Sequence, residues 1–288
     1  MDDLPGRWEG LGGRAAADLV AAREQLHCAA QVVASVPRVL ATPLPDWSHS
    51  AFSWDGSLRA MVSGVIAGRT PFRAALRPAD LRVLLLPAAG REPLAQCAAS
   101  GRPADELFDW LGARAAELTG EPLPGALEQA EEHPPVPCAE DRPLDAGDSS
   151  ALAELERYYV DAALALGALA TSRPEASPLR LWPHHLDLAT LIVLDPGADP
   201  EQARSVGVGM QPGDEGYAEP YFYVTPWPYP PAEDLPGLRG GGRWHTEGWM
   251  GALLLGSELA AAGPARQASQ LQAFLDSAVG GALDLLGA

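Results

Sequence analysis

Short stretches in which apolar and polar residues alternate constrain the fold of this chain more than any other feature. A two-residue period is typical of a strand that buries one face, because successive side chains point to opposite sides of a sheet. Stretches with this pattern occupy residues 179–194, 204–210, 217–226 and 244–255. Apolar residues spaced three to four apart predict helices before and after them, at 149–171 and 267–284.

The first half of the chain repeats this order. A helical spacing of apolar residues covers 13–40, and Pro37 is expected to mark its end. Strand-like runs follow at 48–54, 58–66, 71–77 and 81–87, and a helix is predicted at 104–118. The pattern therefore predicts an α+β protein with antiparallel sheets and packed helices, and it is compatible with two similar helix–strands–helix lobes.

The two halves are separated by residues 119–148, which are rich in Pro, Glu and Asp and lack periodicity. We expect residues 1–288 to form a single domain-scale unit. Lobes at 1–118 and 149–288 would then be joined by the linker 119–148.

The charge of the chain excludes several classes of function. The formal net charge is −18 and every basic residue is an arginine. Without lysine, the chain lacks the amine for pyridoxal phosphate attachment and the Lys of a P-loop for nucleotides. The negative charge disfavours nucleic acid and anionic membranes as partners. No apolar run reaches the roughly 20 residues of a membrane span. We therefore expect a cytoplasmic protein, and the abundance of Ala, Gly, Pro and Arg suggests a bacterial genome.

Three cysteines, Cys28, Cys97 and Cys138, are too far apart in sequence for a CxxC site. Their odd number and their spacing predict reduced, structural thiols.

Alternation in the second half predicts a polar site. If 181–194 is one strand, His184 shares a face with leucines and His185 shares the other face with Asp187. The same argument pairs His245 with Glu247 and Trp249, and it lines Tyr217 and Glu219 up with Tyr221, Tyr223 and Thr225. Glycines in the strand 204–210 would leave room on that face. Should the strands be neighbours, the candidate site residues would meet on one side: His185, Asp187, His245, Glu247, Glu219, Tyr221, Tyr223, Trp182 and Trp249.

Three interpretations of this set stay open. The residues His185, Asp187, His245 and Glu247 could hold a divalent transition metal, or act as general acids and bases without one. The tyrosines and tryptophans would then be walls for an organic ligand. Alternatively, the His–carboxylate pairs are ordinary surface pairs of a half-exposed sheet.

Two segments between the strands are candidates for a functional role. Residues 211–231 are dense in Pro, Gly, Tyr and Trp, which is typical of a lid, a partner surface or a stiff connector. Residues 237–245 place three glycines before the His245 strand, which suits a mobile gate or an ordinary hairpin.

Four stretches resemble a family of bacterial proteins known only as a domain of unknown function. They are REQLHCAAQVV, RTPFRAALRP, LWPHHLDLA and PGDEGYAEPYFYVTPWPYP. The similarity covers most of the chain and implies one domain-scale unit, without an activity, substrate or cofactor.

The leading hypothesis is an enzyme that acts on a small organic molecule, either with or without a metal ion. A small-ligand binding or sensing module without turnover is the first alternative. An interaction protein that uses residues 211–231 as its contact surface is the second. The sequence does not decide between them or fix the oligomeric state.

Overall fold

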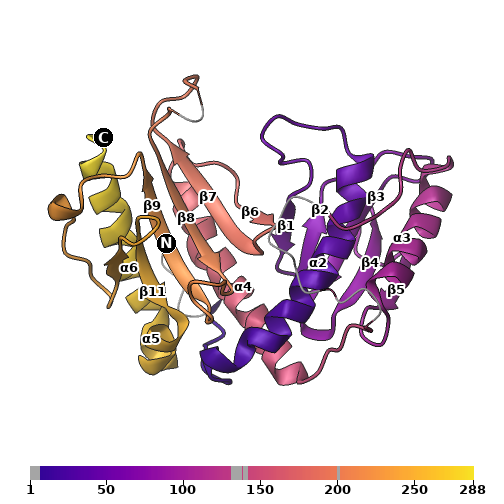
Figure 1. The fold of residues 1–288 in the computed structure, drawn as a ribbon, viewed down its shortest axis with the longest axis horizontal. Helices are drawn as coiled ribbons and strands as arrows, with labels where there is room; N and C mark the ends of the chain where they lie inside the picture. The colour runs from indigo at the N-terminus through magenta and orange to yellow at the C-terminus, as the bar shows by residue number, and fades with distance from the viewer. Residues whose placement is uncertain (1–6, 131–137, 139–141, 200–201) are drawn as a thin grey trace. The chain divides into compact units, whose positions relative to one another are not determined.

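The computed structural model describes residues 7–130, 138, 142–199 and 202–288 (Figure 1). The chain divides into two compact units. Unit 1 comprises Met1–Asp18, Arg157–Leu179 and Asp187–Ala288, and unit 2 comprises Leu19–Glu156 and Arg180–Leu186. Each unit takes segments from both of the lobes that the sequence suggested, and two of the boundaries fall within helices.

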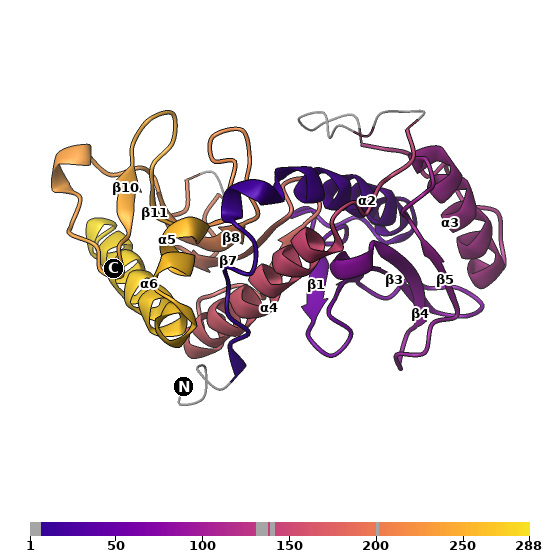
Figure 2. The same ribbon diagram turned by 90° about the horizontal axis from the view of Figure 1, so that it is seen from below.

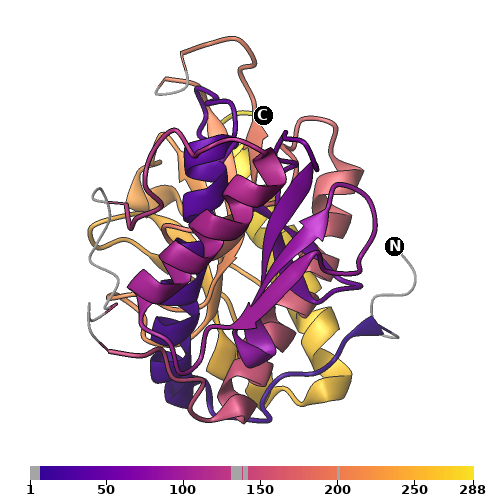
Figure 3. The same cartoon turned by 90° about the vertical axis from the view of Figure 1, so that its right-hand side faces the viewer.

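Unit 2 is built on a sheet of antiparallel strands in the order β6-β1-β2-β3-β4-β5. Its elements are α2 (Val20–Leu40), β1 (Phe52–Asp55), β2 (Ala60–Ser63), β3 (Phe72–Arg77), η2 (Pro78–Asp80), β4 (Arg82–Pro87), β5 (Ala95–Ala98), α3 (Ala104–Thr119) and β6 (Arg180–Trp182). Helices α2 and α3 pack side by side, and α2 also contacts β3 (Figure 3). A cluster of Val62, Leu84 and Leu86 with smaller residues forms a buried apolar core of this sheet.

Unit 1 is built on antiparallel strands in the order β10-β11-β9-β8-β7. Its elements are β7 (Asp187–Val193), β8 (Ser205–Gln211), β9 (Tyr221–Trp227), η3 (Ala232–Asp234), β10 (Arg243–His245), β11 (Gly251–Leu255), α5 (Gly256–Ala261) and α6 (Pro264–Leu285). The short helix η1 (Ala16–Leu19) and the long helix α4 (Ser149–Ser172) run from one unit into the other.

Helix α6 packs on β8, β9 and β11 of unit 1 (Figures 1 and 2). The alternation seen in the sequence explains the core here, because Val208, Phe222 and Val224 are fully buried together with Phe274 of α6. Residues of the opposite sheet face therefore remain for polar contacts.

The predicted α+β class with antiparallel sheets is confirmed, and several boundaries are corrected. The stretch 179–194 is two strands separated by a turn at 183–186, in which Leu186 has a φ of 60°. The stretch 244–255 is likewise a hairpin of β10 and β11. Pro37 lies inside α2, which continues to Leu40. β5 and α5 were not predicted, because four to six residues carry too little periodicity.

The prediction of three reduced thiols is wrong for two of the cysteines. Cys28 of α2 and Cys138 form a disulfide with a Cα–Cα distance of 5.5 Å across a sequence separation of 110, and Cys97 is free and buried. Such a pairing depends on distance in the folded chain, which spacing in the sequence does not reveal. Residues 131–137 and 139–141 of the expected linker lie outside the described residues. Among the helices that are described, none combines the length and apolar character needed to cross a membrane.

Candidate functional site

A row of polar and aromatic side chains lies on one face of the unit 1 sheet. The register places Tyr223 of β9 opposite Gly209 of β8, and Gly209 opposite Ala189 of β7. The Tyr223 ring extends across β8, and its hydroxyl donates a hydrogen bond to the Asp187 carboxylate at 2.6 Å. A Cβ at position 209 would lie 2.6 Å from that ring, so glycine is what lets the ring cross the strand.

The segment between β8 and β9 folds back over this face. Asp214 accepts hydrogen bonds from the backbone N–H groups of Gly216 and Tyr217, both at 2.8 Å. Its second carboxylate oxygen accepts the hydroxyl of Tyr221 at 2.5 Å. The Tyr217 ring then contacts the Tyr221 ring, with centroids 5.3 Å apart. Asp214 therefore fixes both the turn and one tyrosine of the site.

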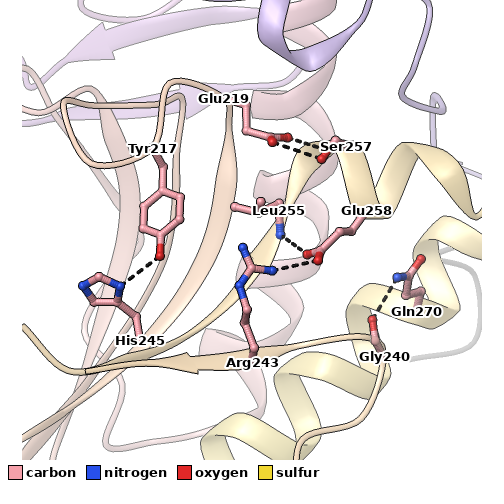
Figure 4. A network of polar contacts seen from close by, with 9 residues as sticks. All are labelled: Tyr217, Glu219, Gly240, Arg243, His245, Leu255, Ser257, Glu258 and Gln270. Atoms are coloured by element: carbon pink, nitrogen blue, oxygen red, sulfur yellow. Dashed lines mark hydrogen bonds and ion pairs between the residues drawn. The ribbon is translucent and has the colours of Figure 1, made fainter. Parts of the chain in front are cut away.

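Tyr217 also reaches the end of β10, where it forms a hydrogen-bonded chain with His245 (Figure 4). The Tyr217 hydroxyl lies 2.9 Å from Nδ1 of His245, and Nε2 lies 2.6 Å from the backbone carbonyl of Glu247. A carbonyl only accepts, so Nε2 carries the hydrogen. In the neutral ring Nδ1 is then the acceptor, and Tyr217 is the donor.

The aromatic rings form a continuous row across the site. The His245 ring lies 4.6 Å from Trp249 and 5.6 Å from Tyr217, and the Tyr221 ring lies 6.3 Å from Tyr223. Gly251 makes room at one end, because a Cβ there would lie 2.4 Å from the Trp249 ring. The row offers ring faces beside hydrogen-bonded polar groups, which is a composition typical of small-molecule sites.

Burial and carboxylates keep two of the tyrosines protonated. Burial is the main cause that raises the pKa of Tyr221 above its usual value, followed by the hydrogen bond to Asp214. Burial and the Asp187 carboxylate raise the pKa of Tyr223 in the same way. Both phenols are therefore hydrogen-bond donors at neutral pH and are poorly suited to act as bases.

The carboxylate of the predicted site residue Glu219 binds Ser257 at the start of α5 (Figure 4). Its carboxylate accepts the backbone N–H of Ser257 at 2.6 Å and the Ser257 hydroxyl at 3.0 Å, at the start of α5. Glu258 similarly accepts Arg243 at 2.7 Å and the N–H of Leu255 at 3.0 Å. These contacts tie the hairpin and α5 together beside the aromatic row.

The expected placement of His184 and His185 is corrected. Both residues lie in the turn 183–186 of unit 2 and not on a strand, so alternation does not separate them. Their ring centroids are 4.5 Å apart, and His184 lies 5.8 Å from the Trp182 ring. The turn is possible because Leu186 adopts the left-handed region and donates its N–H to the carbonyl of Trp182 at 2.7 Å.

Helix α2 holds this turn through the carbonyl of Pro183. That oxygen accepts Nε2 of His27 at 3.0 Å and the amide of Gln31 at 2.7 Å. Burial lowers the pKa of His27 to about 4, although hydrogen bonds to the backbone oppose this effect. His185 thus belongs with His27 in unit 2, whereas Asp187 belongs to the aromatic row of unit 1.

The geometry does not favour the metal hypothesis. Within the residues that the structure describes, no three His, Cys, Asp or Glu side chains are grouped so that they could hold a metal ion. Both ring nitrogens of His245 already have partners, and Glu247 contributes its backbone carbonyl. A transition metal binds an imidazole nitrogen through its free lone pair. In His245 that nitrogen is Nδ1, and its lone pair accepts the hydrogen bond from the Tyr217 hydroxyl.

The segment 211–231 divides into two parts. Asp214, Tyr217 and Tyr221 pack onto the sheet, and Tyr221 is only 5% exposed. Trp227 and Tyr229 are 42% and 45% exposed, with ring centroids 5.3 Å apart.

Two of the three glycines before His245, Gly240 and Gly242, are close-packing positions. A Cβ at Gly240 would lie 2.4 Å from the backbone oxygen of Gln270, and a Cβ at Gly242 would lie 2.4 Å from the Phe274 ring. Gln270 also donates to the Gly240 carbonyl at 2.8 Å (Figure 4). The segment is thereby packed on α6, which argues against the mobile gate.

Asp214 and Tyr217 are members of the row that sequence reasoning did not select. Alternation puts Tyr217 on the same face as Tyr221 and Tyr223, although it was not chosen as a site residue. Asp214 precedes it in PGDEGY, where Asp between two glycines is typical of a turn. No family model, curated protein or solved structure matches this chain.

Proposed function

We propose that the aromatic row of unit 1 is an acid–base site that acts on a small organic molecule. The observation that carries this proposal is the chain from Tyr217 through His245 to the carbonyl of Glu247. A group that exchanges a proton, a base in hydrogen-bond contact with it, and a third group that orients the base are the parts of an activated catalytic residue. The three occur here in that order.

The proton path follows from the tautomer. When a substrate gives a proton to the Tyr217 oxygen, the proton of Tyr217 passes to Nδ1 of His245. The ring becomes an imidazolium whose Nε2–H still donates to the Glu247 carbonyl, and the reverse transfer returns the proton to the product. Tyr217 and His245 are both partly exposed, as access of a ligand to the row requires. Tyr217 differs from Tyr221 and Tyr223 in its hydrogen-bond partner, which is an imidazole nitrogen rather than a carboxylate.

The remaining residues of the row hold Tyr217 and His245 in position for this proton transfer. Asp214 sets the turn before Tyr217, the Tyr221 ring lies beside the Tyr217 ring, and Trp249 lies beside His245. Asp187 holds Tyr223 and thereby one end of the row. We assign no role in this chemistry to His185 or Trp182, and no metal is needed for the proposed proton transfer.

The test uses turnover of small metabolites without a prior choice of substrate. Purified protein is incubated with a fractionated metabolite extract, and mass spectrometry follows compounds that are consumed or formed. For a compound that the wild-type chain converts, Tyr217→Phe is expected to lower turnover by about 100-fold to 10,000-fold. His245→Gln should have an effect of the same order. The matched control is Tyr229→Phe, which removes an exposed phenol outside the row.

Two outcomes would count against this function. Equal turnover by wild-type protein and Tyr217→Phe would refute the proposed proton transfer through Tyr217 to His245. Compounds that bind without conversion would favour the alternative of a ligand-binding module. A direct check is nitrogen NMR of His245, which should show hydrogen on Nε2 in the wild-type protein and a changed Nδ1 signal in Tyr217→Phe.

A second candidate, an interaction surface, is favoured by the exposed Trp227–Tyr229 pair. Leu191 of β7 is also 43% exposed and lies on the same sheet face as Trp227 by register. Exposed aromatic and apolar residues are enriched at contact surfaces. Sedimentation velocity at increasing concentration tests self-association. An interaction through this face predicts a larger species that Trp227→Ser abolishes and Trp47→Ser, at another exposed tryptophan, preserves.

A further inference from the structure

The aromatic row carries a second signal, which concerns the charge of what binds there. The carboxylates of Asp187 and Asp214 both act on the phenol of Tyr221, and both lie on the polar face of the sheet. Arg243 of β10 is engaged by Glu258 at 2.7 Å. A site built this way disfavours an anionic ligand and favours a cation, which ring faces also attract.

Gln211 adds an acceptor at the same place. It is the last residue of β8, its register partner is Tyr221, and it lies one position beyond the pair of Met210 with Leu188. The register therefore puts Gln211 between Tyr221 and Asp187, on the face that carries both. The residue is only 7% exposed, and its carbonyl oxygen has no hydrogen-bond partner among the described residues.

A buried amide oxygen without a donor is costly, because burial removes its hydrogen bonds to water. A ligand with N–H donors removes that cost and is attracted by the two carboxylates. Tyr221 and Tyr223 do not supply the donor, because their hydroxyls are given to Asp214 and Asp187.

We propose that the site recognises a protonated amine attached to an apolar or aromatic body. The ammonium group would donate to the Gln211 carbonyl between Asp187 and Asp214, and the body would lie against the ring row. This inference names the substrate class of the proposed acid–base function and rests on it for turnover, although amine binding is measured separately.

The test compares small probes of one shape by isothermal titration calorimetry at pH 7 and constant salt. Benzylammonium is expected to bind about tenfold more tightly than neutral benzyl alcohol, since a hydrogen bond from a charged donor is stronger than one from a neutral hydroxyl. Benzoate should show no binding. Benzyltrimethylammonium has the charge without N–H donors, so its affinity should not depend on Gln211.

Variants of Gln211 test whether the difference in affinity between the probes depends on its carbonyl oxygen. Gln211→Met is expected to weaken benzylammonium binding about tenfold, to weaken benzyl alcohol less because its hydroxyl is a neutral donor, and to leave benzyltrimethylammonium unchanged. The matched control is Gln272→Met on α6, where a partly exposed glutamine donates a hydrogen bond to Asp276. Gln211→Leu gives a separate readout in urea unfolding. Its stability should equal or exceed that of the wild-type protein, because it removes an unpartnered polar group.

The outcomes separate this inference from the proposed function. Benzyl alcohol or benzoate binding as tightly as benzylammonium would overturn the amine specificity, as would equal benzylammonium affinity in Gln211→Met. Conversion of neutral compounds that depends on Tyr217 would then leave the acid–base function standing. Amine binding that depends on Gln211 without any conversion would support the inference and count against catalysis.

Discussion

The crossing of Tyr223 over Gly209 gives the sharpest quantitative prediction. Gly209→Ala would place a Cβ 2.6 Å from the Tyr223 ring, so the ring must leave its position and its hydroxyl must leave Asp187. Loss of a hydrogen bond to a charged group costs about 1.5–3 kcal/mol. Replacing glycine by alanine in a strand raises the free energy of unfolding by about 0.5–1 kcal/mol. We therefore expect Gly209→Ala to lower the free energy of unfolding by about 1–2 kcal/mol.

Gly207→Ala is the matched control on the same face of β8. A Cβ at position 207 meets only the backbone oxygen of Thr225, at 3.9 Å, which is an ordinary contact. This variant should gain about 0.5–1 kcal/mol. The strand preference cancels in the comparison, so the two variants should differ by about 1.5–3 kcal/mol, the strength of the Tyr223–Asp187 contact.

Urea unfolding followed by circular dichroism measures the difference. With a slope of about 3 kcal/mol per molar urea, the midpoints of the two variants should lie about 0.5–1 M apart. In a Tyr223→Val background the ring is gone, and Gly209→Ala should behave like Gly207→Ala. Equal midpoints for the two alanine variants with Tyr223 present would refute the reasoning, because the ring would then tolerate a side chain below it.

Three further predictions concern pH and oxidation. The folded state raises the pKa of Tyr223 above the ordinary value of 10.0, so the stability that its phenol adds is complete below pH 10 and is lost at higher pH. The stability difference between wild-type protein and Tyr223→Phe should shrink accordingly in urea titrations above pH 10. Burial lowers the pKa of His27 from 6.5 to about 4, so stability should fall as pH drops through this window, by up to about 3 kcal/mol. His27→Gln should remove that fall, and an unchanged pH profile in His27→Gln would contradict it. Under denaturing, non-reducing conditions, mass spectrometry after alkylation should find one free thiol, at Cys97. Cys138→Ser should lower stability by about 2–4 kcal/mol, and three alkylated cysteines in the oxidised wild-type protein would disprove the crosslink.

The sequence determined the class of fold and most of its elements. Helices α2, α3, α4 and α6 follow from apolar residues at helical spacing over 16 or more positions. Strands such as β8 and β9 follow from the alternation that buries Val208, Phe222 and Val224. These signals are local, because a helix or a half-buried strand needs only the periodicity of its own residues.

Part of the site was also visible in the sequence. Tyr221 and Tyr223 share a face because they are two residues apart on β9, and the empty positions of β8 follow from its glycines. The prediction that His185 shares a strand face with Asp187 is wrong, because alternation holds only while the backbone stays extended, and Leu186 breaks it with a left-handed conformation.

The partners of each side chain were decided by the tertiary structure. Tyr217 meets His245 across 28 positions of sequence, and Cys28 meets Cys138 across 110. Only the return of the segment 212–220 over the sheet brings Tyr217 to the end of β10. Hydrogen bonds and disulfides need contact in space, and residue types repeated along a chain do not state which copies will touch. The sequence thus determined which faces are polar, and the packing of strands and turns determined which polar groups share a proton.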